Sequence, residues 1–411
     1  MIVSSAIWSD LLSEASKKTR YFLEDGILEK INYTANISFG PRVRKSPFFE
    51  ATMRYGAKAF TIYNHVFMPT VYAGPTDEYW KLVNGVTLWD VTCQRQIEIA
   101  GPDALRFIKY ITPRNLSSSE AGKCMYVLLT DEKGGIVNDA VMLHLNDEQF
   151  WLSPGDGDAL LWVQGLAVNS GMDIRVFEPD VSTLQLQGPK STQVIQALFG
   201  NWPLELGYYR MKETTLDGIP LVLSRTGWSG ELGFELYLRD HRHGERLWDM
   251  IMKAGAPWDI TPIAPSQIRS IEGGLLSYFS DISRDDSPYT LGMDRLVDLD
   301  QEHEFVGKEA LKQIKEQGPS YRLVGIELPG EPMKGSNNEF WTVLNNGRKV
   351  GRVTRCIYSP RLEKNIGFVN IEAELAAIGT QLTIKMTDSE RPAIVCEWPW
   401  IKAEKTIPAI S

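Results

Sequence analysis

Hydrophobic residues recur along the chain with two periods, and the segments that show these periods alternate. Segments in which every second residue is apolar predict strands, because successive side chains of a strand point to opposite faces. Segments with apolar residues three and four positions apart predict amphipathic helices. The strands predicted before residue 319 are 59–65, 96–100, 125–130, 136–145, 150–153, 219–223 and 234–238. The helices predicted there are 78–83, 104–111, 158–166, 245–254, 266–278 and 308–316.

One pattern of strand, turn and helix occurs twice. The sequence QIEIAGPDALRFIKYI ends its strand at Gly101, and TLQLQGPKSTQVIQALF ends its strand at Gly188, 87 residues later. A Gly-Pro pair ends a strand, and an apolar stripe with helical spacing follows each pair. The period is too long for a solenoid. We therefore expect two related halves packed around a shared centre.

The C-terminal part of the chain has a different pattern. From residue 321 onward, short strands are separated by turn signals such as Asn346-Gly347. This pattern predicts a small β-barrel or sandwich. The predicted fold class is therefore α+β, with a bilobal core that contains the internal β-α repeat and a C-terminal all-β barrel domain. The predicted domains are an N-terminal extension 1–44, a core 45–318 and a barrel domain 319–411.

Composition restricts the classes of function. The 411 residues carry a net charge of −9, which argues against a general nucleic-acid surface. No run of about 18 apolar residues occurs, so we expect no membrane-spanning helix and no membrane partner. The N-terminus lacks a basic segment before an apolar run and does not resemble a signal peptide. The spacing of its apolar residues at 7–12 suits a short amphipathic helix instead.

Cysteine and histidine usage points away from disulfides and metals. The four cysteines are far apart in the sequence and form no CxxC pair. We therefore expect neither a disulfide framework nor a thiolate metal site, and a reducing cytoplasm is the compartment that fits best. His241 and His243 lie in RDHRHGER, which is typical of a solvated loop, and their spacing predicts no zinc site.

Two carboxylates stand inside apolar strands. Asp139 follows the Gly134-Gly135 turn in GGIVNDAVML, and Glu235 lies between large apolar residues in GFELYL. A carboxylate is costly to bury without a partner. The residue types alone leave two interpretations open. Each carboxylate either faces solvent or a strand end, or it binds a ligand that donates hydrogen bonds.

Longer motifs around these carboxylates resemble one family. SRTGWSGELGFELYL is similar to T-G-Y-[ST]-G-E-x-G-[FY]-E, a signature of the glycine-cleavage T-protein (aminomethyltransferase) family, which binds tetrahydrofolate. GGIVNDAV is similar to the family's G-G-x-x-[DN]-D-x-[VI]. Trp228 replaces the signature's Tyr, and Asn138 stands where aminomethyltransferases usually have Asp. Both changes resemble the family's dimethylsulfoniopropionate demethylase branch. The resemblance covers residues 45–370 and implies a T-protein-like folate-binding core.

The resemblance also implies roles for individual residues. Asp139 corresponds to the family's catalytic aspartate near N5 and N10 of the folate. Tyr126, Trp228 and Glu235 correspond to residues beside the pterin, where Glu235 accepts hydrogen bonds from the amino-pyrimidine edge. Tyr237 points to the same face of its strand as Glu235 and is added to the cofactor-binding group. Tetrahydrofolate is accordingly the expected methyl acceptor, and no metal is expected.

One motif departs from the family. The family usually has Arg two residues before the Glu of L-R-x-E-x-G, whereas this chain has Ser270 there, in IRSIEGG. Arg269 precedes that position by one residue. A shift of one residue turns a helical side chain by about 100°. The resemblance therefore does not transfer the contact of the family's Arg to Arg269.

The activity implied is transfer of a methyl group from a small-molecule donor to N5 of tetrahydrofolate. The donor stays open between dimethylsulfoniopropionate and an O-methyl aromatic acid of the methoxybenzoate type. A sulfonium favours an aromatic cage. An aryl methyl ether needs a proton donor near its oxygen, for which Tyr63, His65 and His144 are candidates. Of these, Tyr63 and His65 are the predicted substrate residues.

Two other functions remain as alternatives. One is a glycine-cleavage-type aminomethyltransferase that receives its one-carbon unit from a lipoyl carrier protein. The other is a folate-binding regulator without enzymatic activity, which retention of Asp139 and Glu235 disfavours. A flavin-linked oxidase is not expected, because no G-x-G-x-x-G follows a strand.

Overall fold

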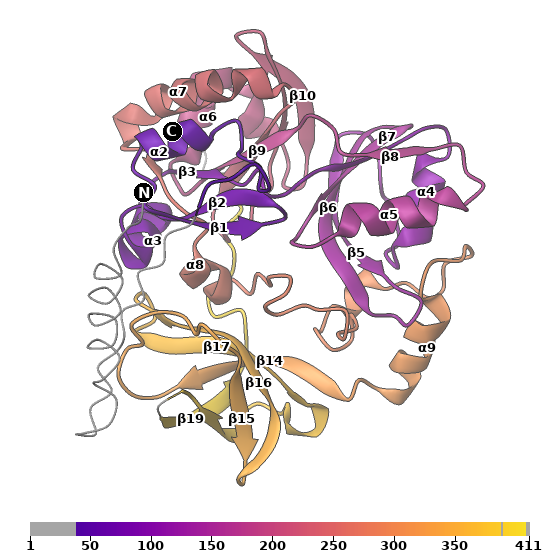
Figure 1. Ribbon diagram of the computed structural model, residues 1–411, viewed down its shortest axis with the longest axis vertical. Coiled ribbons are helices and arrows are strands. Elements are labelled where there is room, and N and C mark those ends of the chain that lie inside the picture. The colour runs from indigo at the N-terminus through magenta and orange to yellow at the C-terminus, as the bar shows by residue number, and fades with distance from the viewer. Residues whose placement is uncertain (1–37, 388, 408–411) are drawn as a thin grey trace, which may run out of the picture. The chain divides into compact units, whose positions relative to one another are not determined.

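The computed structural model describes residues 38–387 and 389–407 (Figure 1). The helix predicted at 7–12 and most of the predicted extension 1–44 lie outside these residues. The α-helices of the described residues are α2 (Phe49–Arg54), α3 (Pro75–Asn84), α4 (Ala104–Ile111), α5 (Ala159–Val168), α6 (Ser191–Phe199), α7 (Gly244–Gly255), α8 (Gln267–Glu272) and α9 (Lys308–Gln317).

The first lobe is built on a five-stranded antiparallel sheet with the order β5-β6-β7-β4-β8. Its strands are β4 (Ile97–Ala100), β5 (Lys123–Thr130), β6 (Ile136–Asn146), β7 (Gln149–Pro154) and β8 (Arg175–Phe177). Helices α4 and α5 cover one face of the sheet, where Phe107 and Val163 pack against Ile99 and Met142. The alternation along β6 therefore leaves its other residues for the opposite face.

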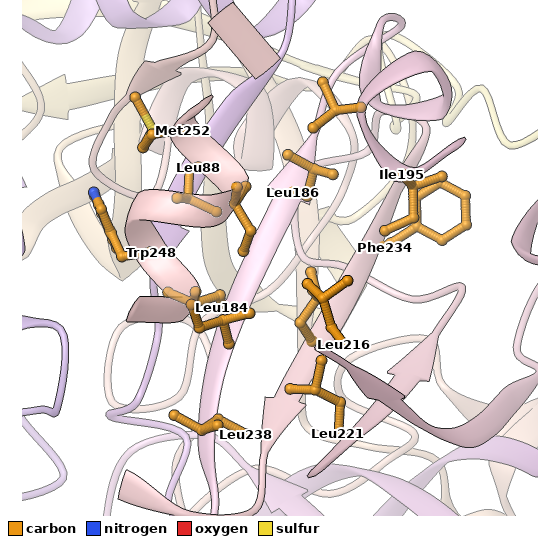
Figure 2. Close-up of a cluster of buried hydrophobic side chains, with 14 of the residues drawn as sticks. Leu88, Leu184, Leu186, Ile195, Leu216, Leu221, Phe234, Leu238, Trp248 and Met252 are labelled. Atoms are coloured by element: carbon orange, nitrogen blue, oxygen red, sulfur yellow. The ribbon is translucent and has the colours of Figure 1, made fainter. Parts of the chain in front are cut away.

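The second lobe is built on a six-stranded sheet with the order β10-β11-β12-β9-β3-β13. Its strands are β3 (Thr87–Asp90), β9 (Ser182–Gln187), β10 (Met211–Leu216), β11 (Ile219–Ser224), β12 (Gly233–Leu238) and β13 (Thr261–Pro262). Helices α6 and α7 cover its outer face, where Trp248, Leu184 and Phe234 belong to one buried cluster (Figure 2). Burial of each such large side chain contributes about 1.5–3 kcal/mol.

The predicted internal repeat is present, one copy in each lobe. In both copies a strand leads through a glycine into a helix, β4 into α4 and β9 into α6, and a three-stranded meander follows. Gly101 has φ +141° and Gly188 has φ +118°. A Cβ would lie 2.4 Å from the carbonyl oxygen of Asp173 at the first position and 2.5 Å from that of Gly85 at the second. Only glycine permits both the backbone angle and the close approach.

The two sheets pack against each other through their inner faces. One buried cluster joins Leu143 and Trp151 of the first sheet to Val222 and Tyr237 of the second. The rings of Trp151 and Tyr237 have centroids 6.1 Å apart. The core is therefore layered helix, sheet, sheet, helix, which confirms the predicted bilobal arrangement around a shared centre. Residues on the inner faces of β6 and β12 lie between the lobes.

A hairpin precedes the first lobe. Its strands are β1 (Ala59–Tyr63) and β2 (Val66–Val71). A strand was predicted over 59–65, but β1 ends at Tyr63. Asn64 and His65 instead form the turn, with φ values of +52° and +63°.

The C-terminal domain is a closed six-stranded barrel, as predicted. Its order is β14-β17-β16-β15-β18-β19. The strands are β14 (Tyr321–Leu328), β15 (Trp341–Asn345), β16 (Arg348–Ser359), β17 (Lys364–Glu372), β18 (Gln381–Lys385) and β19 (Glu390–Cys396). Helix α8 contacts β16 and β17, so the barrel packs on the core next to this helix (Figure 1).

The helix predicted over 266–278 is shorter than expected. Ser266 caps α8 by accepting a hydrogen bond from the Arg269 amide at 3.3 Å, and the helix ends at Glu272. Gly274 follows with φ +68°, a conformation that ends helices. The apolar residues beyond it belong to a loop, so reading their spacing as helical was wrong.

Among the residues that the structure describes, every helix is too short or too polar to span a lipid bilayer.

Candidate active site

Asp139 lies near the start of β6, on the face that points between the lobes. Its Oδ2 accepts a hydrogen bond of 2.8 Å from the hydroxyl of Tyr126, on the neighbouring strand β5. Its Oδ1 is buried and has no hydrogen-bond partner among the described residues. Most buried polar atoms have partners, so an unpartnered carboxylate oxygen is unusual and marks a place where a ligand can bind.

Burial raises the pKa of Asp139 from 3.8 to about 6. The hydrogen bond from Tyr126 opposes this rise, and the charge of Asp281 adds to it. Burial and the nearby Asp139 carboxylate hold the pKa of Tyr126 well above its usual range, so Tyr126 stays a hydrogen-bond donor. A carboxyl group with a pKa near the working pH is suited to exchange protons with a ligand.

The loop that follows β7 fixes the backbone beside Asp139. Asn138 accepts a hydrogen bond from the Gly155 amide at 2.8 Å and donates one to the Asp156 carbonyl at 2.7 Å. Asn64 binds the same loop from the β1–β2 turn. Its backbone amide donates a hydrogen bond to Asp156 Oδ1 at 2.7 Å, and its side-chain amide donates one to the Gly155 carbonyl at 2.9 Å. The hairpin therefore lies close to Asp139.

This placement brings Tyr63 but not His65 into the interior. Burial raises the pKa of Tyr63 well above its usual range, and the charges of Cys93 and Asp139 add to the rise. His65 is exposed at the turn, with Nε2 3.4 Å from Asp158 Oδ1. His144 is at the far end of β6, with Nδ1 2.8 Å from the hydroxyl of Ser119.

Glu235 lies between the sheets with 3% of its surface exposed. Its Oε1 accepts from Gln185 Nε2 at 2.8 Å, and its Oε2 accepts from Tyr237 at 3.1 Å and from the hydroxyl of Thr226. Burial raises the pKa of Glu235, and these three donors oppose the rise. Three protein donors leave room for about one further hydrogen bond. The assignment of Glu235 and Tyr237 to the pterin stays a prediction.

Trp228 lies between the hydrogen-bond network of Glu235 and the cluster that Tyr63 packs against. Its amide donates to Gln185 Oε1 at 3.3 Å, and the Nε2 of the same glutamine binds Glu235. Its indole Nε1 donates to the Leu276 carbonyl at 3.2 Å. Its ring packs, together with Tyr63, against a buried cluster that contains Cys93. Trp228 and Tyr63 therefore offer aromatic surface on one side of the interior.

Sequence reasoning missed several residues that hold this site. Gln185 stands opposite Glu235 in the register of β9 and β12. A polar residue between Leu184 and Leu186 of a fully buried strand is a signal that could have identified it. Asp281 and Arg355 gave no such signal, because they meet only through the packing of the barrel on the core.

Metal-ligating residues gather elsewhere. Within the described part of the chain, Asp180, Asp240 and His241 bring their ligand atoms within 4.8 Å of one another near the surface. Arg242 forms an ion pair with Asp240 at 2.6 Å, which satisfies part of this group without an ion. The absence of a metal from the function stays a prediction.

Comparisons with known proteins agree with the architecture. Residues 48–301 match the family profile described as GCVT N-terminal domain, and residues 322–402 match the glycine cleavage T-protein C-terminal barrel domain. The chain is 35% identical over 368 residues to dimethylsulfoniopropionate demethylase DmdA from Ruegeria pomeroyi, covering 89% of this chain and 100% of the relative. It is 31% identical over 372 residues to an aminomethyltransferase from Shouchella clausii, covering 89% and 99%.

A solved structure shows the same fold. The crystal structure of glycine cleavage system aminomethyltransferase T from Bartonella henselae superposes with a TM-score of 0.79 and 22% sequence identity, covering 89% of this chain and 99% of the other.

Proposed function

Because the chain belongs to the glycine cleavage T-protein family, we propose that it is a demethylase that moves a methyl group from a small methylated acid to N5 of tetrahydrofolate. The coarser statement follows from the family: the chain is an enzyme of one-carbon transfer that uses tetrahydrofolate. The observation that carries the proposal is Asp139, whose buried Oδ1 has no partner among the residues that the structure describes and whose pKa burial raises to about 6.

The residues of the interior fit a flat, hydrogen-bonding cofactor. Asp139 Oδ1 is an open acceptor, and Trp228 and Tyr63 supply aromatic surface. Tetrahydrofolate, when bound, supplies the nitrogen that accepts the one-carbon unit. Asp139 orients that ligand through Oδ1 and takes up the proton that is released there. Tyr126 holds the carboxylate in place through Oδ2, so that its geometry is fixed before the ligand arrives.

For the donor, we propose a small sulfonium acid of the dimethylsulfoniopropionate class. The support is the 35% identity to a demethylase of that compound over its whole length, together with the aromatic side chains of Tyr63 and Trp228, which pack against one cluster of the interior. Aromatic faces stabilise cations such as a sulfonium. The reaction then needs a small-molecule donor and no carrier protein.

An aryl methyl ether is the second candidate, because one observation favours it. The hydroxyl of Tyr63 keeps its proton, since burial raises its pKa well above the usual range. A protonated hydroxyl is the group that a departing phenolate requires. His65, which was also predicted for this role, is exposed on the β1–β2 turn, so Tyr63 is the better candidate donor.

Aminomethyl transfer is less compatible with position 138. Aminomethyltransferases resemble this chain but usually have Asp there. In this chain the amide of Asn138 both accepts from Gly155 and donates to Asp156. An aspartate could not donate to the Asp156 carbonyl. The loop beside Asp139 is therefore built for asparagine.

The test is an incubation of the protein with tetrahydrofolate and each donor in turn, with 5-methyltetrahydrofolate and 5,10-methylenetetrahydrofolate both measured by mass spectrometry. The donors are dimethylsulfoniopropionate, a panel of methoxybenzoates, and an aminomethylated lipoyl carrier protein. Product from dimethylsulfoniopropionate alone supports the proposal, and product from a methoxybenzoate changes the donor class. Formation of 5,10-methylenetetrahydrofolate from the carrier protein, with release of ammonia, would show aminomethyl transfer. Folate binding without any product would support the alternative of a folate-binding regulator without enzymatic activity.

A further inference from the structure

Residues 275–282 form a tight loop that lies beside Asp139. The hydroxyl of Tyr278 donates a hydrogen bond of 3.1 Å to the backbone at the start of β6. A Cβ built on Gly155 would lie 3.0 Å from Asp139 Oδ1 and 3.1 Å from Tyr278 Cβ, so both groups border the same small space. The charge of Asp281 acts on the pKa of Asp139. The loop is thus one wall of the proposed active site.

The loop also supports the aromatic side of the site. The carbonyl of Leu276 accepts the hydrogen bond from the indole of Trp228 at 3.2 Å. A displacement of residues 275–282 would therefore move both the neighbourhood of Asp139 and the anchor of the Trp228 ring.

Arg355 holds this loop from the barrel domain. It extends from β16 and is 7% exposed. Its Nη2 donates to the Leu275 carbonyl at 2.6 Å and lies 2.5 Å from Asp281 Oδ2. Its Nη1 donates to the Ser270 hydroxyl at 3.0 Å. One planar guanidinium therefore ties the start of the loop, its acidic residue and helix α8 together.

Asp281 is held from several directions at once. Its Oδ1 accepts from the hydroxyl of Thr354 at 2.7 Å, and its Oδ2 accepts from the amide of Ser277 at 2.9 Å. Asp281 is 1% exposed, so Arg355 is its compensating charge in a buried environment. A buried carboxylate that loses such a partner is strongly disfavoured.

We infer that Arg355 is a positioning residue of the active site, and that it supplies from the barrel the guanidinium that α8 lacks at Ser270. The inference rests on the proposed function. Its basis is the contact between Arg355 Nη1 and the Ser270 hydroxyl, which places the guanidinium next to the position where the family usually has its arginine. Arg355 does not touch Asp139. It acts through residues 275–282, and the barrel therefore contributes to the reaction.

The first test is Arg355→Gln, with Arg352→Gln as the matched control. Arg352 is on the same strand but stacks on Phe340, 4.7 Å from the ring centroid. Hydrogen exchange measured by mass spectrometry should show faster exchange in residues 275–282 of Arg355→Gln and no change there in the control. This readout does not depend on any donor. If Arg355→Gln does not fold, Arg355→Lys replaces it, because it keeps a charge opposite Asp281 and loses the planar fork.

The second readout is kinetic. We expect kcat of Arg355→Gln to fall by on the order of 10- to 100-fold, because misplacement of about 1 Å has this effect on aligned groups. The acid limb of its pH profile should move to higher pH, because the uncompensated charge of Asp281 raises the pKa of Asp139 further. If the substitution only reduced the amount of folded protein, kcat would fall equally at every pH and the acid limb would not move.

A relocation variant tests the position of the guanidinium directly. Ser270→Arg combined with Arg355→Ser moves the arginine from the barrel to α8 and leaves a hydroxyl on the barrel. We expect kcat of this double variant to be at least tenfold higher than kcat of Arg355→Ser alone. Ser270→Arg alone should be slower than wild type, because two guanidinium groups would then share one buried space.

The inference would be overturned if hydrogen exchange in residues 275–282 were the same in Arg355→Gln as in wild type. It would also be overturned if hydrogen exchange there were faster but kcat and its pH profile were unaltered. A relocation pair no faster than Arg355→Ser would also overturn it. If wild-type protein forms no 5-methyltetrahydrofolate with any donor, the proposed function fails, and hydrogen exchange alone then decides whether Arg355 positions the loop.

Discussion

Replacing Asp139 by Asn is expected to stabilise the fold while it abolishes methyl transfer. Burial raises the pKa of Asp139 from 3.8 to about 6. At roughly 1.4 kcal/mol for each tenfold change in proton affinity, ionising this carboxyl costs the folded state about 3 kcal/mol. Asn has nearly the same shape, carries no charge, and keeps an oxygen that can accept the hydrogen bond from Tyr126.

The sign of the pH dependence follows from the raised pKa of Asp139. Below pH 3.8 the carboxyl is protonated in the folded and unfolded states, so its ionisation costs nothing. Between pH 3.8 and 6 the unfolded chain ionises first, and stability falls as the pH rises. Above pH 6 the cost is complete. The gain from Asn should therefore be about 3 kcal/mol at pH 8 and roughly half of that at pH 5.

The assay is thermal unfolding of wild type and Asp139→Asn at pH 8 and pH 5, beside the initial rate of 5-methyltetrahydrofolate formation. Asp147→Asn serves as control, because Asp147 is an exposed carboxylate in the turn after the same strand. The melting temperature of the control should not change. Equal or absent stabilisation of Asp139→Asn at the two pH values would refute the burial argument. An undiminished rate would refute the catalytic assignment of Asp139.

Three further variants test other parts of the structure. Tyr126→Phe removes a donor that lowers the pKa of Asp139, so the acid limb of kcat/KM against pH should move above about pH 6; an unmoved limb contradicts this. Gly188→Ala should lower the melting temperature more than Gly200→Ala, because both have positive φ but only Gly188 meets a neighbouring backbone; equal losses would contradict the close-packing argument. Glu235→Gln should lower the free energy of unfolding by about 1–3 kcal/mol in urea titrations, because the amide NH2 of the introduced glutamine would face a hydrogen-bond donor. An unchanged free energy of unfolding would contradict the observed network.

Local patterns predicted most of the fold. Strand alternation and the paired Gly101 and Gly188 turns depend on residues next to one another, and both were found where the sequence placed them. The end of α8 was mispredicted because the apolar residues after Gly274 keep a helical spacing in a segment that is not helical. Periodicity reports which residues are buried, and a buried loop produces a similar pattern.

The site was predictable only in its carboxylates. Asp139 and Glu235 stood out because charged residues are rare inside apolar strands. Their surroundings come from distant parts of the chain: Gln185 is 50 residues from Glu235, and Arg355 is 85 residues from Ser270. Such pairings depend on how sheets and domains pack, which no short segment records. The assigned roles of all predicted site residues stay predictions: Asp139, Tyr126, Trp228, Glu235, Tyr237, Tyr63 and His65.

The order of the strands has a consequence for how the core comes apart. Strand β3 precedes the first lobe in the sequence, yet it lies in the sheet of the second lobe, between β9 and β13. Cutting the chain between β8 and β9 would therefore remove an interior strand from the second sheet and leave β9 with an open edge. The second lobe is therefore not one continuous segment of the chain and cannot be cut out as a transplantable module. A calorimetric scan of the core should accordingly show both lobes melting in one cooperative step.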